Sequence, residues 1–170
     1  MLKVLIADDE EKICQLIIKL INWEEMGLKI AATASNGIEA LEQAKICKPE
    51  ILITDIRMPG IDGMELIRKV KEKLPDTEII IISGYRHFEY AQTAIRYGVR
   101  NYLLKPIKKE ELRDTLQKIA DIYREKNEQL NFEERVRLAL KNDAGKLRTS
   151  FISRMIYGDR ERENIISLKE

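Results

Sequence analysis

Short apolar runs of strand length alternate along the chain with segments in which apolar residues recur every three or four positions. The first run covers residues 2–7 and stops at Asp8. An apolar stripe at i, i+3, i+4, i+7 and i+8 follows it and predicts an amphipathic helix. The stripe consists of Ile13, Leu16, Ile17, Leu20 and Ile21. The chain is therefore expected to begin with a strand and a helix.

The same strand and helix cycle repeats four more times. Further strands are predicted at residues 28–34, 50–54, 78–82 and 100–104. Further helices are predicted from Asn36 to Lys48, through Leu66 to near Pro75, from about Arg86 to Tyr97, and from Lys108 onward. Pro49 ends the second helix because the residue before a proline avoids the α region, and Gly98 can adopt the left-handed conformation that closes the fourth.

Five strands alternating with five helices predict an α/β fold with a doubly wound, parallel five-stranded sheet. The four isoleucines of residues 79–82 put apolar side chains on both faces, which is typical of a central strand covered by helices on both sides. In such sheets ligands bind beyond the carboxyl ends of the strands. The residues that follow each strand are therefore the first candidates for a functional site.

Composition limits the classes of protein. With 170 residues, one domain and an appendage fit, but two domains of ordinary size do not. No uninterrupted apolar run exceeds the four isoleucines, far fewer than the roughly 20 residues of a membrane span. The start MLKVLIADDE has no cationic segment followed by a long apolar one, so we expect no secretory signal, no membrane partner and a cytoplasmic location.

Charge and cysteine content argue against two further classes. The net charge of +1 disfavours a general affinity for nucleic acid or anionic membranes, so any partner is expected to recognise a local site. Cys14 and Cys47 lack CxxC spacing and fall in predicted helices. We therefore expect two free thiols and neither a disulfide nor a cysteine metal site.

Polar groups end four of the five predicted strands. Asp8 and Asp9 follow the first, Asp55 the third, Ser83 the fourth and Lys105 the fifth. Three carboxylates at one sheet edge repel one another unless a cation neutralises them. Oxygen ligands without His or Cys favour Mg²⁺. A lysine ammonium and a serine hydroxyl beside such an ion would suit a phosphoryl group.

Each residue also has a simpler interpretation. Asp9 before a helix could be only an N-cap, and Asp55 could be a loop carboxylate bonded to its own backbone. Ser83-Gly84 and Lys105-Pro106 could be ordinary turns. We favour the joint interpretation because an acid pair, an acid, a hydroxyl and a lysine end strands one, three, four and five.

Four motifs in order resemble the receiver domain of two-component response regulators: VLIADDE, ILITDIRMPGIDG, IIIISGY and YLLKPI. The resemblance covers about residues 2–122. The segments NWEEMGLKIAATASNGIEAL and SGYRHFEYAQTAIRYGVRNYLLKPI are most similar to the receivers of AraC-type, YesN-like regulators. The resemblance implies a flavodoxin-like, CheY-like sheet in the order 2-1-3-4-5.

The resemblance also implies roles at the acidic cluster. Asp55 matches the phosphoryl-accepting aspartate. Asp9 matches a direct Mg²⁺ ligand and Asp8 one that acts through water, while Arg57 matches the position whose backbone carbonyl completes the metal site. Tyr85 and Arg57 are expected to flank the path of the hydrolytic water.

A second group of matches concerns the switch. Ser83 matches the hydroxyl residue that turns toward the phosphoryl group, and Lys105 matches the lysine that pairs with it. Tyr102 matches an aromatic rotamer switch, and the Lys105-Pro106 bond matches a peptide that is typically cis.

These matches imply a signalling domain and not an enzyme. A sensor histidine kinase is expected to donate its phosphoryl group to Asp55 with Mg²⁺, and no other cofactor is expected. Small phosphodonors and self-dephosphorylation are expected to act at the same residue. The output face is expected to be the fourth helix, fifth strand and fifth helix.

The remaining chain is expected to be a helical extension, with the receiver over residues 1–122 and a linker or dimerisation segment over 123–170. Leu112, Leu116, Ile119 and Tyr123 alternate by four and three, which fits either a coiled-coil seam or packing on the sheet. Gly145 is expected to interrupt the helix. We expect a homodimer through the fifth helix and linker.

Two output classes stay open. Only 48 residues follow Ile122, too few for the pair of helix-turn-helix units of an AraC-type regulator. The chain therefore has the features of the amino-terminal part of a longer transcription regulator, with DNA binding in a missing carboxyl-terminal domain. The alternative is a stand-alone receiver that acts by protein contact through its helical tail.

Two other functions share the topology and are disfavoured. A haloacid-dehalogenase-like phosphatase needs a second aspartate two residues after the first, where this chain has Arg57. A flavodoxin-like nucleotide binder offers glycines and hydroxyls to a phosphate in its first loop. Asp8, Asp9 and Glu10 would repel one.

Overall fold

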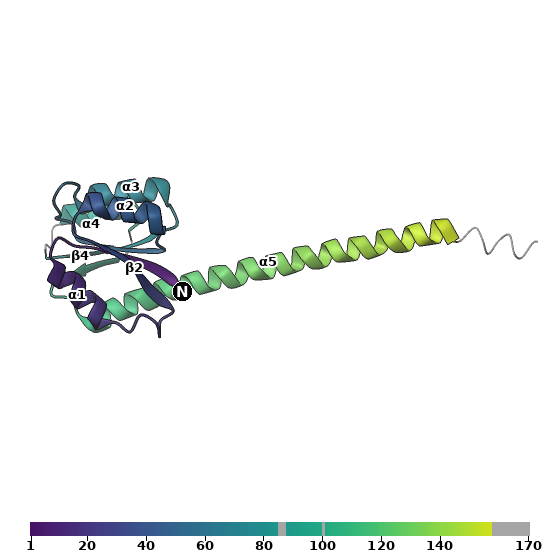
Figure 1. The fold of residues 1–170 in the computed structure, drawn as a ribbon, viewed down its shortest axis with the longest axis horizontal. Helices are drawn as coiled ribbons and strands as arrows, with labels where there is room; N and C mark the ends of the chain where they lie inside the picture. The colour runs from purple at the N-terminus through teal and green to yellow at the C-terminus, as the bar shows by residue number, and fades with distance from the viewer. Residues whose placement is uncertain (85–87, 100, 158–170) are drawn as a thin grey trace, which may run out of the picture. The chain divides into compact units, whose positions relative to one another are not determined.

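The computed structural model describes residues 1–84, 88–99 and 101–157. Five strands alternate with five helices (Figure 1). In order they are β1 (Leu2–Ala7), α1 (Glu11–Leu20), β2 (Leu28–Ala34), α2 (Gly37–Cys47), β3 (Ile51–Thr54), α3 (Gly63–Lys73), β4 (Glu78–Ser83), α4 (Phe88–Arg96), β5 (Asn101–Leu104) and α5 (Lys109–Tyr157). Arg86 and Arg100, where one helix and one strand were expected to start, lie outside the described residues, as does Tyr85.

The strands form one parallel sheet in the order β2-β1-β3-β4-β5, which confirms the predicted fold class. Helices α2, α3 and α4 lie on one face, and α1 and the first turns of α5 lie on the other (Figure 1). Side chains of one parity in the strands join the first layer in a core that includes Leu5, Leu52, Ile79, Ile81, Ala40, Leu66 and Ile67. Ile79 to Ile82 are all at most 1 % exposed, as a central strand covered on both faces requires.

The second layer buries the apolar stripe at the start of α5. Leu112 and Leu116 are 0 % exposed and Ile119 is 2 % exposed. This stripe therefore packs in the core and is not available as a self-association seam. The chain as a whole divides into two compact units, Met1–Ile122, which includes this stripe, and Tyr123–Glu170. Among the described residues, no helix is both long enough and apolar enough to span a membrane.

One predicted boundary is wrong in the second unit. Gly145 was expected to interrupt the helix, but α5 continues through it to Tyr157. A single helical glycine costs about 1 kcal/mol relative to alanine. The strong helix formers on both sides, such as Ala144 and Leu147, offset that cost.

The strands at residues 2–7 and 28–34 have the predicted bounds, and several other elements differ by one or two residues. β3 begins at Ile51 and not at Glu50, although the Glu50 amide and carbonyl still bond to neighbouring strands. Gly98 has a positive φ of 76°, as predicted for the end of α4. Cys14 and Cys47 are both free, as predicted.

The start of α2 carries a reciprocal cap whose removal should be measurable. The side chain of Asn36 accepts from the Glu39 amide at 2.9 Å, and Glu39 Oε2 accepts from the amide of Ser35 at 2.8 Å. The Ser35 bonds lower the pKa of Glu39, so the cap is complete above the ordinary Glu range and weakens as pH falls through that lowered pKa. We expect Asn36→Ala to lower the free energy of unfolding by about 1 kcal/mol in urea titrations. Asn36→Asp keeps the acceptor, and its free energy of unfolding should stay close to that of the parent. If Asn36→Ala were as stable as the parent, the cap would be contradicted.

Candidate functional site

The carboxyl ends of four strands bring the predicted polar residues to one edge of the sheet. Asp8 follows β1, Asp55 follows β3, Ser83 ends β4 and Lys105 follows β5. The parallel hydrogen-bond ladder continues into these residues. The Asp55 amide donates to the Ala7 carbonyl at 2.9 Å, and the Lys105 amide donates to the Ser83 carbonyl at 2.9 Å. The backbone positions of the site are therefore set by the sheet itself.

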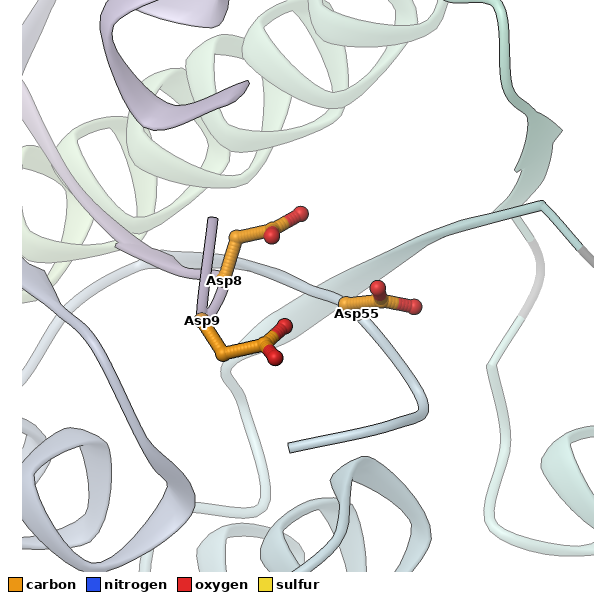
Figure 2. A group of neighbouring side chains, drawn as sticks. All are labelled: Asp8, Asp9 and Asp55. Carbon is orange, nitrogen blue, oxygen red and sulfur yellow. The ribbon is translucent and has the colours of Figure 1, made fainter. Parts of the chain in front are cut away.

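Three carboxylates meet at this edge. Asp8, Asp9 and Asp55 each offer an oxygen, and these oxygens all lie within 4.8 Å of one another. Their side chains project into the same space (Figure 2). Asp8 is 2 % exposed and Asp55 is 8 % exposed, whereas Asp9 is open to solvent. Two nearly buried carboxylates and one exposed carboxylate form an anionic cluster that is open to solvent at Asp9.

The simpler interpretation of Asp9 as an N-cap is wrong. The N-cap of α1 is Glu10, and it makes no side-chain cap bond. Asp8 accepts from the Glu10 amide through Oδ1 at 2.9 Å. The side chain of Asp9 is thus left to the acidic cluster.

Asp55 has two different partners for its two oxygens. Oδ1 accepts from the amide of the next residue, Ile56, as the loop-residue interpretation expected. Oδ2 lies 2.9 Å from Lys105 Nζ, across 50 residues of sequence. The local backbone therefore accounts for one oxygen only, and the other faces a cation.

Lys105 lies among carboxylates. Its Nζ is 2.9 Å from Asp55 Oδ2, 3.0 Å from Asp8 Oδ2 and 3.5 Å from Glu10 Oε1. Burial by itself would lower the pKa of Lys105, but the hydrogen bonds to Asp55 and Asp8 outweigh it and raise the pKa. The ammonium is therefore a permanent positive charge. The peptide bond from Lys105 to Pro106 is cis, as the resemblance implied.

Lys105 does not fully neutralise the two buried carboxylates that it contacts, Asp8 and Asp55. Burial raises the pKa of Asp8, and the bonds from the Glu10 amide and Lys105 offset this only in part. The pKa of Lys105 rises while that of its partner Asp8 is not lowered, because Asp8 is the more deeply buried of the two side chains. An additional cation at the cluster would favour the ionised form of Asp8.

Ser83 and Tyr102 contact one another on the side of the site toward β5. Ser83 is fully buried at the end of β4, and Tyr102 is half-buried in β5. Burial raises the pKa of Tyr102, a hydrogen bond with Ser83 lowers it, and the negative charge of Asp55 raises it further. The phenol therefore stays neutral, and its hydroxyl is coupled to the serine and to the field of the acidic cluster.

Two glycines hold the loop between β3 and α3, and neither was predicted as a site residue. A Cβ on Gly63 would overlap the Asp55 carbonyl oxygen and come within 2.8 Å of Ile56 Cα. The Gly63 amide donates to the Ile56 carbonyl at 2.7 Å. A Cβ on Gly37 would overlap the carbonyl oxygen of Ile61 in the same loop. The only available signal was a glycine in the first turn of each helix, where alanine would otherwise be favoured.

Glu10 and Arg57 are exposed and lie close in sequence to the acidic residues. Glu10 was not predicted as a site residue, yet its 64 % exposed side chain reaches Lys105 from the rim. Arg57 lies two residues after Asp55 with an exposed side chain, and the proposed role of its carbonyl stays a prediction. The site as a whole combines the carboxylate of Asp55, a fixed ammonium and the acidic pair Asp8 and Asp9, which is a set suited to phosphoryl transfer.

Comparison with known proteins gives a consistent result. Residues 4–117 match the family model described as the response regulator receiver domain. The chain is 40 % identical over 139 residues to YesN of Bacillus subtilis, named an uncharacterized transcriptional regulatory protein, covering 78 % of this chain and 38 % of that protein. It is 40 % identical over 107 residues to the transcriptional regulatory protein HptR of Staphylococcus aureus, covering 63 % and 42 %.

Solved structures agree. The receiver domain of AraT, a response regulator from Geobacillus stearothermophilus, matches with a TM-score of 0.71 and 41 % identity, over 74 % of this chain and 98 % of that one. A two-component transcriptional regulator AraC from Clostridium phytofermentans matches with a TM-score of 0.67 and 36 % identity, over 71 % and 94 %. The chain spans less than half the length of the curated relatives it matches.

Proposed function

The chain belongs to the family of response regulator receiver domains, and from this premise we propose that Asp55 accepts a phosphoryl group from a sensor histidine kinase in a Mg²⁺-dependent reaction. One observation carries the proposal above all. Lys105 Nζ lies 2.9 Å from Asp55 Oδ2, while oxygens of Asp8 and Asp9 lie within 4.8 Å of an Asp55 oxygen. A nucleophile, a cation and an acidic pair are thus within reach of one phosphorus atom.

The donor set fits Mg²⁺. Among the described residues, this cluster consists of three carboxylates without His or Cys, which match the oxygen ligands that this ion prefers. Asp9 and Asp55 would bind it directly, Asp8 would act through water, and the Arg57 carbonyl would complete the set. When bound, the ion would neutralise carboxylate charge and polarise an oxygen of the incoming phosphoryl group.

The chain's own residues account for the transfer step. A carboxylate oxygen of Asp55 forms the new O–P bond as the N–P bond of the phosphohistidine breaks, and the imidazole nitrogen keeps the electron pair and takes up a proton. Asp55 needs no general base because it reacts as an anion. Lys105 screens the repulsion between the anionic carboxylate and the anionic phosphoryl group, so charge neutralisation and positioning supply the rate. Small phosphodonors would react at the same oxygen. Water would later hydrolyse the acyl phosphate, which releases inorganic phosphate and restores the Asp55 carboxylate.

The switch starts at Ser83. A phosphoryl group on Asp55 adds acceptor oxygens beside the serine hydroxyl, which then donates to one of them. Tyr102 loses its present partner and repacks into the space that the serine leaves. A local charge change thereby biases the face formed by α4, β5 and the start of α5.

The output is proposed to be transcriptional, in the cytoplasm, and to depend on a DNA-binding domain that these residues do not include. The names of the relatives support a transcriptional role, and the partial coverage of their length leaves room for such a domain. We also propose a homodimer through α5 and the linker, where Ile122 and Leu130 are 47 % and 54 % exposed and lie eight positions apart on one side of the helix. Light scattering with and without beryllofluoride and Mg²⁺ would test it. A constant monomer mass would favour the stand-alone receiver instead.

Metal binding should be visible in stability before any phosphoryl transfer. Because only the folded chain assembles the three carboxylates, Mg²⁺ at 100 times its dissociation constant should stabilise the fold by about 2.7 kcal/mol. Thermal unfolding with Mg²⁺ and with EDTA measures this difference. Asp9→Asn removes an exposed ligand and should lose most of it. An Mg²⁺ effect of equal size in that variant would contradict the site.

Asp8→Asn should stabilise the metal-free chain. The pKa of Asp8 is raised in the fold, so ionised Asp8 opposes folding: its contribution is favourable below the ordinary Asp pKa and is lost as pH rises through the raised pKa. In EDTA at pH 7 we expect a higher melting temperature for the variant, and the difference should close below about pH 4. Calorimetry against pH would show this, and a variant less stable than the parent at pH 7 would refute it.

A further inference from the structure

A cavity of about 210 Å³ lies between α2 and α3, away from the phosphoacceptor. Its floor is apolar and consists of Leu41, Ala44, Val70 and Leu74. Its rim consists of the lysines at positions 45, 48, 69 and 73. The helices run antiparallel to the strands, so their carboxyl-terminal halves, which line the cavity, lie toward the opposite edge of the sheet from Asp55.

The rim keeps most of its positive charge. None of the eight lining residues is acidic. Lys69 lies 3.4 Å from Glu65 Oε1, but Arg68 holds that same oxygen at 2.7 Å and its hydrogen bonds lower the pKa of Glu65 to about 2. Arg68 also pairs with Glu72 at 2.6 Å, so Glu65 offsets part of the charge of Lys69. The other three lysines have no acidic residue beside them among the lining residues, and the ring therefore presents an excess of ammonium groups.

The helix dipole explains only part of this ring. Lysines in a last helical turn compensate the negative helix end, which accounts for Lys45 in α2 and Lys73 in α3. Lys69 lies a turn earlier in α3, where it contacts Glu65, and Lys48 is the C-cap of α2. These local roles do not require that all four lysines line one cavity, as they do.

Lys48 is in an unfavourable conformation for its type. It has φ 46° and ψ 69°, in the left-handed region, and its amide caps α2 by donating to the Ala44 carbonyl at 3.0 Å. Glycine is the usual residue at such a position, and another L-residue costs about 1 kcal/mol or more there. Lysine therefore reduces stability at this position while adding a fourth ammonium to the cavity rim.

From this cavity we propose a docking site for an acidic segment of a partner protein that inserts one bulky apolar side chain between α2 and α3. The volume is near the roughly 150 Å³ that holds a single benzene ring and below the roughly 300 Å³ where drug-sized pockets begin. Carboxylates flanking the inserted side chain would meet the lysines. No aromatic residue or arginine lines the cavity to stack on bases, which disfavours single-stranded nucleic acid.

The test uses the full chain, labelled with ¹⁵N, and a blocked peptide Glu-Glu-Phe-Glu-Glu as the probe. We expect amide shifts centred on Ala44 and Val70 and an affinity that falls as salt screens the lysines. Lys69→Gln with Lys73→Gln should weaken binding by up to about fivefold for each lysine. The matched control, Lys12→Gln with Lys19→Gln on α1, removes the same charge and should bind like the parent.

Lys48→Gly separates binding from folding. Glycine relieves the left-handed strain, so this variant should melt at a higher temperature while it binds the peptide more weakly. Four results would overturn the proposal: no shifts at millimolar peptide, equal weakening in the α1 control, equal binding when alanine replaces the probe's phenylalanine, or shifts at Ala44 and Val70 only with anionic phosphatidylglycerol vesicles. The docking site shares no residue with the acidic cluster around Asp55, so failure of the docking proposal would leave the proposed function untouched.

Discussion

Asp55→Asn is expected to abolish phosphorylation by acetyl phosphate while the circular dichroism spectrum stays that of the parent. The amide keeps an oxygen to accept from the Ile56 amide, so the loop should retain its shape. It has no anionic oxygen to attack phosphorus, and its contact with Lys105 is no longer an ion pair. Loss of a nucleophile that acts within a charged unit typically costs about 10⁴-fold or more in rate. Labelling should fall below detection in intact-mass spectra.

The same loop offers a matched control for this variant. Asp62 is the exposed N-cap of α3, and asparagine caps as well as aspartate does. Asp62→Asn therefore makes the same chemical change seven residues away without altering the acidic cluster, and this variant should be labelled like the parent. Stoichiometric labelling of Asp55→Asn would refute the assignment of the acceptor.

Gly63→Ala should have a large effect on the fold, and it acts directly on the backbone of Asp55. The new Cβ would overlap the Asp55 carbonyl oxygen and approach Ile56 Cα, and both are backbone atoms that cannot move aside cheaply. Overpacking of this kind typically costs about 1–3 kcal/mol, and we expect the upper end in urea titrations. Because the clash is with Asp55 itself, phosphorylation of the remaining folded protein should also slow.

Gly84→Ala serves as the comparison for stability. A Cβ at Gly84 meets no atom of the described residues within 4 Å, so the melting temperature of this variant should stay near that of the parent. If Gly63→Ala were as stable and as readily labelled as Gly84→Ala, the close approach of α3 to the acceptor would have no role.

The order of elements and the candidate site could be predicted from the sequence because both follow from periodicity. A stripe such as Ile13 to Ile21 specifies a helix face, and a run such as Ile79 to Ile82 specifies a covered strand. Parallel topology then places every residue that follows a strand at one edge. Asp8, Asp55 and Lys105 were predicted to meet on that basis, and the 2.9 and 3.0 Å contacts of Lys105 agree.

Contacts that depend on exact backbone paths could not be predicted. The overlap that any side chain on Gly63 would have with Asp55 arises from the distance between a loop and a helix start, which no local pattern encodes. The reach of Glu10 to Lys105 depends on where α1 begins, and the sequence suggested Asp9 and not Glu10 as its cap. The path of α5 through Gly145 could not be predicted from the weak local preference of one glycine, because the helix formers around it outweigh that preference.

The most direct test of the central claim is chemical mapping of the phosphorylated residue. The chain is treated with acetyl phosphate and Mg²⁺, reduced with borohydride, digested and sequenced by mass spectrometry. An acyl phosphate on Asp55 would be reduced to homoserine at that position alone. Homoserine at Asp8, Asp9 or any other aspartate, or none under conditions that phosphorylate the chain, would contradict the account.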